Sequence, residues 1–314
     1  MLAFTVRKLA ISLFTLFGVA VVLFILVRVV PGDPADAILG QFPTDAERQR
    51  ILEQYRLDQS LPVQFGVWLR EAVQGDLGYS WYTREPVTRS IADALPITLQ
   101  LALMALAFAL IVGIPLGILA AIRRGKLLDY LCSGFGVLGV SIPNFWLGAM
   151  LILIFAFYLR IMPSAGVPRF TEDPLGNLQA MILPTLALGT AVAAVVMRMT
   201  RSSMLEVLNQ DYVRTAKAKG LAPNIVVTRH ALRNALIPIL TITGIQTGYL
   251  LGGSVVIEQV FGLRGVGWLV FNAATNRDYF LLQAVVLFIA AVFITINLVV
   301  DLVYGLVDPR MRKT

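Results

Sequence analysis

Residues 9–30 read LAISLFTLFGVAVVLFILVRVV, and this stretch carries no charged residue before Arg28. A bilayer core about 30 Å thick is crossed by roughly 20 apolar residues in a helix, so the stretch predicts a transmembrane helix. A cleaved signal peptide has a shorter apolar core and a small-residue cleavage site. This run instead ends in Arg28 and Pro31-Gly32-Asp33-Pro34. We therefore predict that residues 1–30 form a retained transmembrane helix.

Five further stretches have the length and apolarity of membrane spans. They cover about 97–122, 131–158, 180–196, 236–257 and 280–304, and Pro143 interrupts the second of them. The composition agrees, because 57% of the residues are hydrophobic and 14% are charged, against about 45–50% and 25% in soluble domains. The mean hydropathy is +0.76. The predicted fold class is an all-α membrane protein with six transmembrane helices.

The rare residue types exclude several kinds of site. The chain has one cysteine, Cys132, and one histidine, His230. These numbers exclude a disulfide framework and a Cys/His zinc site, so we expect no metal centre. They also argue against a Ser-His-Asp or Cys-His enzyme, since His230 would have to serve among arginines. The net charge of +7 would suit a nucleic-acid partner, but in a membrane protein basic residues mark cytoplasmic loops, and we expect no nucleic acid.

The distribution of Lys and Arg predicts the orientation. Six spans leave both termini on one side of the membrane. The segments on that side hold 15 of the 26 basic residues, including all five lysines, and are 1–8, 122–130, 197–234 and 305–314. The opposite segments hold 10, in a longer length of chain. The positive-inside rule then places both termini in the cytoplasm.

Segment 31–95 is too long for a simple connector and should carry helices of its own on the outer side. Thr44-Asp45-Ala46-Glu47 is typical of a capping box that opens a helix. A second helix is predicted after Ser60, which could cap it, and Gly75 should end it. Its apolar face would consist of Phe65, Trp68, Leu69, Ala72 and Val73. These helices could lie at the outer surface, cover the mouth of a path, or pack against the bundle.

Segment 197–234 joins two spans on the basic side. A short helix is expected from Asp211 to Lys219, because Asp211 can cap it and Gly220 can stop it. Pro223 blocks its continuation. Residues 224–234 then look helical and lead into the fifth span. Charge alone would also suit an ordinary inner loop.

The residue order in this segment carries a resemblance. Asp211-Tyr212-Val213-Arg214-Thr215-Ala216-Lys217-Ala218-Lys219-Gly220-Leu221, followed by Arg229-His230-Ala231-Leu232-Arg233-Asn234-Ala235, resembles the "EAA" loop of ABC importer permeases. It is most similar to the form found in the dipeptide/oligopeptide permease family. The match is imperfect, since Arg214 occupies the glutamate position of the general pattern, Thr215 its first alanine and Arg233 its proline.

Other motifs extend the resemblance over nearly the whole chain, in order. They are Pro31-Gly32-Asp33-Pro34, Gly75-Asp76-Leu77-Gly78-Tyr79-Ser80, Pro86-Val87, Ser141-Ile142-Pro143-Asn144-Phe145-Trp146, Glu258-Gln259-Val260-Phe261-Gly262, Gly265-Val266-Gly267 and Asp308-Pro309-Arg310.

The resemblance implies a permease subunit of an ATP-driven importer in the bacterial inner membrane, with the type I ABC importer permease fold. It implies the division 1–30, a transmembrane helix; 31–95, an extracytoplasmic helical segment; and 96–314, a five-helix core whose EAA loop covers 204–234. The partners implied are a second, paralogous permease, two ATPase subunits and an extracytoplasmic solute-binding protein. The residues expected to dock the ATPase are Arg214, Thr215, Ala216, Lys217, Ala218, Gly220, Leu221, His230, Arg233 and Asn234.

Nucleotide should bind elsewhere than on this chain. The sequence contains no G-x-x-x-x-G-K-[ST] loop, so it cannot cradle phosphates in that way. We therefore expect no cofactor and no enzymatic activity here, with ATP and Mg²⁺ on the ATPase subunits. Work would reach the permease through the short helix, which would fit a groove by its small residues Ala216 and Ala218.

The translocation path is expected to run past polar residues within the spans, namely Ser141, Asn144, Gln246, Thr247 and Tyr249. Such residues also hold membrane helices together, so packing is an alternative for each. A neutral lining would suit zwitterionic di- or oligopeptides. Another solute of the same family, such as a metal chelate or a glutathione-like molecule, is an alternative substrate. A secondary transporter is a weaker alternative, because the spans hold almost no internal charge.

Overall fold

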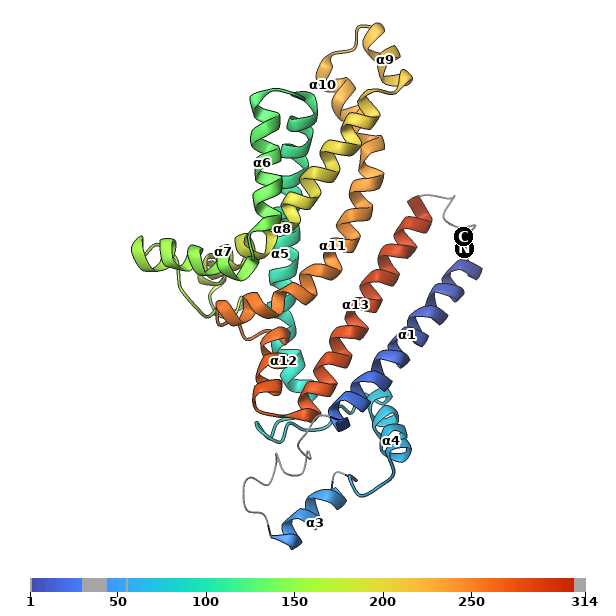
Figure 1. Cartoon of the computed structure of the whole chain (residues 1–314), viewed down its shortest axis with the longest axis vertical. Helices are drawn as coiled ribbons and strands as arrows, with labels where there is room; N and C mark the ends of the chain where they lie inside the picture. The colour runs from blue at the N-terminus through green and yellow to red at the C-terminus, as the bar shows by residue number, and fades with distance from the viewer. Residues whose placement is uncertain (1, 30–43, 55, 308–314) are drawn as a thin grey trace. The chain divides into compact units, whose positions relative to one another are not determined.

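The computed structural model describes residues 2–29, 44–54 and 56–307, and these are almost entirely helical (Figure 1). Within them the backbone forms an isolated antiparallel bridge between Tyr79 and Pro86 and no β-strand. The contacts divide the chain into two compact units, which are described separately. One consists of Met1–Ile97 with Arg264–Thr314, and the other of Thr98–Leu263.

Five helical stretches of the described chain are long and apolar enough to cross a membrane. They comprise α1 (Leu2–Val29), α5 (Val87–Ile122), α8 (Pro174–Leu208), the stretch from Pro223 into α11 (Arg233–Val260), and α13 (Tyr279–Val307). The predicted spans 9–30, 97–122, 180–196, 236–257 and 280–304 fall on these stretches, so the all-α membrane fold class is confirmed.

The third predicted span, 131–158, differs from a straight helix. It consists of α6 (Leu127–Ser141), α7 (Asn144–Leu151) and a π-helical continuation, Ile152–Tyr158, with a bend of 102° between the two halves. Ile142 and Pro143 have extended backbone angles at the bend. Proline lacks an N–H donor and disfavours the helical region for the residue before it, so the break follows from the Ile142-Pro143 pair. The described residues contain six candidate spans if the bent pair counts as one of them.

The predicted boundary near residue 95 falls inside a helix. Helix α5 begins at Val87 and has 36 residues, which corresponds to roughly 54 Å at helical rise. It is therefore much longer than a bilayer core is thick. The division into 1–30, 31–95 and 96–314 concerns sides of the membrane and stays a prediction.

In the first unit, two short helices occupy the segment predicted to be helical. Helix α3 (Asp45–Gln54) opens with the expected capping box, since the Thr44 N–H and hydroxyl both donate to Glu47, at 3.0 and 2.7 Å. The hydroxyl bond holds the pKa of the Glu47 carboxyl below its usual value. The Glu47 N–H in turn donates to the Thr44 hydroxyl, so each residue satisfies a backbone donor.

Helix α4 (Leu61–Val73) packs against α1. Phe65 lies 5.3 Å from Phe24, ring centroid to ring centroid. The predicted apolar face is partly buried, except Val73, which is 81% exposed. Ser60 occupies the predicted N-cap position, and its carbonyl accepts the Val63 and Gln64 N–H groups, but its hydroxyl makes no capping bond. Of the three roles considered for these helices, the structure supports packing against another helix for α4, because α4 lies against α1.

The first unit is completed by α12 (Val266–Thr275), α13 and the first turns of α5. Their buried side chains form one apolar cluster, which includes Val87, Ile91, Ala273, Leu281 and Val285. The loop after α4 is held to the start of α13, because the buried Ser80 hydroxyl donates to the buried Asp278 carboxylate.

The second unit is built around α8, the most deeply buried of the long apolar helices described. Helices α6, α7 and α11 all pack against it. Glycines also allow α5 to lie close to α8. A Cβ on Gly113 or Gly117 of α5 would lie 2.7 or 2.6 Å from a backbone oxygen of α8. Close packing through small residues is typical of membrane helices, since lipid supplies little hydrophobic drive for their association.

Candidate functional site

The predicted short helix on the basic loop is α9 (Asp211–Ala218). Gln210 occupies the N-cap position, so the assignment of that role to Asp211 is corrected by one residue. Val213 and Ala216 are buried and pack with Val226, Val207 and Leu208 of the same chain. The apolar side of this amphipathic helix is therefore covered by other residues of the permease itself.

This burial corrects the role expected for Ala216. The side chain is 6% exposed and lies inside the loop, so it cannot enter a groove of another subunit. The opposite face of α9 is exposed and carries Arg214, Thr215 and Ala218. At 100° per residue these three positions lie across the helix from Val213 and Ala216. The face available to a partner is therefore set by the helical period, and of the two alanines only Ala218 belongs to it.

The end of α9 is a Schellman motif around Gly220. The residue has a φ of +77°, and its N–H donates to the Lys217 carbonyl at 3.0 Å. The Leu221 N–H donates to the Ala216 carbonyl at 3.4 Å. Glycine adopts positive φ without a steric penalty, so Gly220 allows the reversal that sends the chain to Pro223. The predicted stop at this position is confirmed.

Beyond Pro223 the chain is helical, as expected, but part of it is widened. After the short helix α10 (Pro223–Ile225), residues Val226–Leu232 form a π-helix that runs into α11. Asn234 sits in the first turn of α11 and donates through Nδ2 to the Tyr212 hydroxyl at 2.7 Å. Tyr212 belongs to α9, so this bond ties α9 to α11. The predicted docking residues His230 and Arg233 lie on this connection, His230 half-buried and Arg233 exposed.

A hollow of about 580 Å³ lies beside α9. Two of the predicted docking residues, Lys217 and Leu221, line it together with Ile122, Arg124 and Pro223. Its walls come from the ends of α5 and α8 as well as from the α9–α10 connection. The predicted residues thus divide between the outward face of α9, the hollow and the connection to α11.

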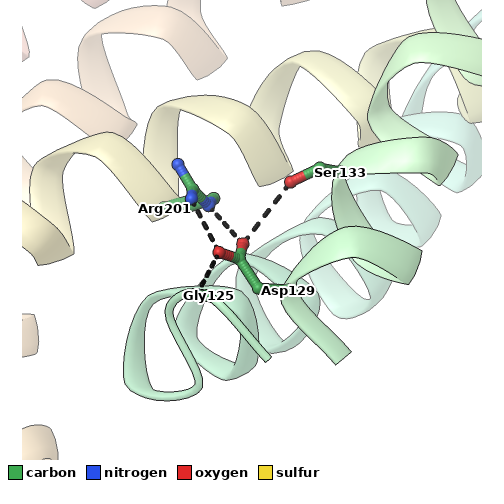
Figure 2. Close-up of polar contacts among 4 residues, drawn as sticks. All are labelled: Gly125, Asp129, Ser133 and Arg201. Carbon is green, nitrogen blue, oxygen red and sulfur yellow. Dashed lines mark hydrogen bonds and ion pairs between the residues drawn. The ribbon is translucent and has the colours of Figure 1, made fainter. Parts of the chain in front are cut away.

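Near this hollow, the turn between α5 and α6 is fixed by an ion pair that the sequence did not reveal (Figure 2). The buried carboxylate of Asp129 accepts from Arg201 Nε at 2.6 Å and from Arg201 Nη2 at 2.9 Å. It also accepts from the Gly125 N–H at 3.0 Å. Arg201 lies on α8 two turns before its end, so the pair joins the turn that carries Arg124 to the helix that leads into α9.

Three of the five residues predicted for the path come together. Asn144, Gln246 and Tyr249 line one hollow of about 510 Å³, with Pro143 and Val195 among its other walls. The other two are not among its lining residues. Ser141 and Thr247 donate their hydroxyls to carbonyls of their own helices, at 2.8 and 2.9 Å. These bonds stay within α6 and α11, so for Ser141 and Thr247 both the path role and the packing role stay predictions.

The break between α6 and α7 helps to shape this hollow. It places Asn144 at the first position of α7, and the side chains of Gln246 and Tyr249 come from α11. The part of the chain that the structure describes holds no group of three or more His, Cys, Asp or Glu side chains placed to bind a metal. The described lining of the hollow is mostly apolar, and its polar side chains, those of Asn144, Gln246 and Tyr249, are uncharged.

Comparison with known protein families gives matches over nearly the whole chain. Residues 113–313 match the family described as "Binding-protein-dependent transport system inner membrane component", and residues 1–102 match its N-terminal counterpart. The chain belongs to this family. The sequence-based identification as an inner-membrane ABC importer permease is thereby confirmed.

Individual relatives span the full length. A putative peptide transport system permease of Brucella abortus is 41% identical, with 99% of each chain covered. A di/tripeptide transport system permease of Pseudomonas aeruginosa is 40% identical, again over 99% of each chain. A glutathione transport system permease of Escherichia coli is 42% identical, also over 99% of each chain.

Among solved structures, a chain of the MetNI methionine ABC transporter in an inward-facing conformation matches with a TM-score of 0.58. The match covers 71% of the present chain and 99% of that chain, at 20% identity. It supports the type I importer permease fold for the core.

Proposed function

We propose that this permease is one of two subunits that form the path of a peptide importer driven by partner ATPases. Relatives that match over the full length carry names of peptide and di/tripeptide permeases. The second subunit would be a paralogue, and a solute-binding protein would deliver the substrate. Both termini and α9 would face the cytoplasm, as the distribution of Lys and Arg predicts.

The observation that carries the mechanism is the bond from Asn234 to Tyr212. It links α9 to the first turn of α11, the helix that carries Gln246 and Tyr249. A push on the exposed face of α9 would therefore reach the hollow through one helix. Arg214, Thr215 and Ala218 would form the docking surface, while Val213 and Ala216 keep α9 fixed to its own chain.

The hollow lined by Asn144, Gln246 and Tyr249 would form this subunit's half of the path. Its polar groups are neutral amides and a phenol, which can bond to both ends of a zwitterionic peptide. A fixed charge would bind one terminus tightly and hold the substrate. Substrate selection would lie mainly with the solute-binding protein.

The coupling proposal is tested with Ala218→Glu. Ala218 is exposed in the isolated chain, so the variant should insert and fold normally. In the assembled importer the larger side chain would overfill the contact, and removing its carboxylate from water would cost several kcal/mol even beside Arg214. We expect loss of the ATPase subunit on pull-down, and loss of uptake, at an unchanged membrane level. The matched control is Ala46→Glu, an exposed alanine of the short helix α3, which should transport normally.

Full ATPase retention and uptake in Ala218→Glu would place the docking surface elsewhere. Ala216→Glu is not equivalent, because it would place a carboxylate inside the loop cluster of the permease itself. That variant should lower the amount of folded protein.

A second candidate substrate is a glutathione-like peptide, favoured by the 42% identity with the glutathione permease. Uptake of labelled dialanine, competed by glutathione, distinguishes the two. Inhibition by unlabelled dialanine but not by glutathione would favour the ordinary peptide.

A further inference from the structure

A small cavity lies within the unit formed by residues 1–97 and 264–314, and none of its described lining residues is among those assigned to transport. Its volume is about 200 Å³, and α1, α4, α13 and the loop after α4 contribute its walls. The loop is held in place by the Ser80–Asp278 bond, and Asp278 also accepts the Leu281 N–H at 3.1 Å. The cavity is therefore enclosed by packed elements on several sides.

One wall carries a buried amide without a partner. Gln283 of α13 is 3% exposed, and its Nε2 atom makes no hydrogen bond within the described part of the chain. Buried polar groups are nearly always bonded. A second amide, Gln64, is also buried, but its Nε2 donates to the carbonyls of Leu57 and Gln59. Gln283, which also lines the cavity, thus differs from its neighbour in having amide N–H donors that no described group accepts.

Among the described lining residues the charges balance. Arg28 and Arg56 supply two positive charges, and Glu71 and Asp76 supply two negative charges. Arg56 Nη1 lies 3.6 Å from Glu71 Oε1. A lining whose described residues carry both signs suits a ligand that itself carries both signs. An ammonium with N–H donors can bond to the carboxylates, and an anionic oxygen can accept from guanidinium and amide.

The position of the cavity indicates where such a ligand would come from. Arg28 lies in the last turn of the apolar helix α1, where a membrane helix reaches the headgroup layer. Just before it, Val22, Ile25 and Leu26 are all more than half exposed on the outside of α1. An acyl chain could lie along these side chains while its headgroup enters the cavity. The volume is below the roughly 300–1,000 Å³ of pockets for drug-sized molecules, which suits a headgroup better than an oligopeptide.

We propose that this cavity binds a compact zwitterion with an anionic oxygen group and a primary ammonium, supplied by the headgroup of an ethanolamine phospholipid. The same chemistry occurs in a free amino acid or a small peptide. The apolar flank of α1 favours the lipid, because only the lipid has a chain to lay along it.

The test is native mass spectrometry of the purified full chain with its complex, in detergent with added phosphatidylethanolamine, phosphatidylcholine or phosphatidylglycerol. We expect retention of phosphatidylethanolamine in preference to the other two, since choline lacks N–H donors and glycerol lacks the cation. Gln283→Leu, which keeps the side-chain size, should weaken this binding about tenfold, as a lost bond to a charged group would. The matched control is Gln259→Leu, whose amide nitrogen is also buried and unpartnered but lies outside the cavity, and it should bind normally.

A second variant covers the case in which Gln283→Leu fails to fold. Glu71→Gln changes a half-exposed side chain and should reduce the preference for ethanolamine over choline. Equal retention of the three lipids, or normal binding by Gln283→Leu, would overturn the proposal. Displacement of the lipid by free glycine or dialanine would keep the zwitterion site but overturn the lipid as its source.

Discussion

The ion pair between Asp129 and Arg201 should contribute strongly to the stability of the second unit. Asp129 is 4% exposed and Arg201 binds it through two nitrogens. Removing one partner of a buried pair costs about 3–5 kcal/mol, because the other charge is left buried and unpaired. The Arg201 side chain is 30% exposed and can regain some hydration, so we expect the lower end, about 3 kcal/mol, for Asp129→Ala.

The double-mutant cycle isolates this contribution. Arg201→Met keeps the apolar stem and leaves the buried Asp129 carboxylate, which still accepts from the Gly125 N–H and the Ser133 hydroxyl. Because these two donors remain, this variant should also cost about 3 kcal/mol. The double variant removes both charges together and should cost about the same as either single change. The coupling energy is then about 3 kcal/mol, at the upper end for residues in contact.

The assay is reversible denaturation of the purified chain in mixed micelles with increasing SDS, followed by tryptophan fluorescence. The control is Arg169→Ala, which breaks an exposed pair with Glu172 at 3.8 Å. Exposed pairs contribute about 0–1 kcal/mol, so the control should stay close to the parent protein. If Asp129→Ala cost as little as Arg169→Ala, the argument from burial would be refuted.

Three further expectations concern packing, topology and nucleotide. Gly117→Ala should destabilise the chain by about 1–3 kcal/mol in the same assay, because its Cβ would overlap a backbone oxygen of α8. The control is Gly134→Ala, whose Cβ would meet no atom within 4 Å, and it should be neutral or stabilising. With Cys132 replaced by alanine, a membrane-impermeant thiol reagent added from outside should label Glu53→Cys and leave Lys217→Cys unlabelled; the reverse pattern would invert the proposed topology. The purified chain should neither bind nor hydrolyse ATP, since its sequence has no phosphate-binding loop, and turnover that copurifies with the chain through several columns would contradict this.

Features that depend on a short length of chain could be predicted from the sequence. The apolar stretches predict where membrane helices run, because the thickness of the bilayer sets a length that residue counting can meet. The Thr44–Glu47 capping box and the stop at Gly220 are local in the same sense, since each needs only a few neighbouring residues. Asn144, Gln246 and Tyr249 could be named as polar residues in apolar surroundings, although nothing in the sequence showed that they share one hollow.

Features that depend on residues far apart along the chain were decided by the tertiary structure. Ala216 is buried because Val226 and Leu208 cover that side of α9. Asp129 and Arg201 lie 72 positions apart, and the packing of α6 on α8 brings them together. Pro143 indicates an interruption, but the 102° bend requires α8 and α11 for α7 to lie against. Helical period and span length are properties of the local chain, whereas the partner of a buried charge or small side chain is set by which helices pack together.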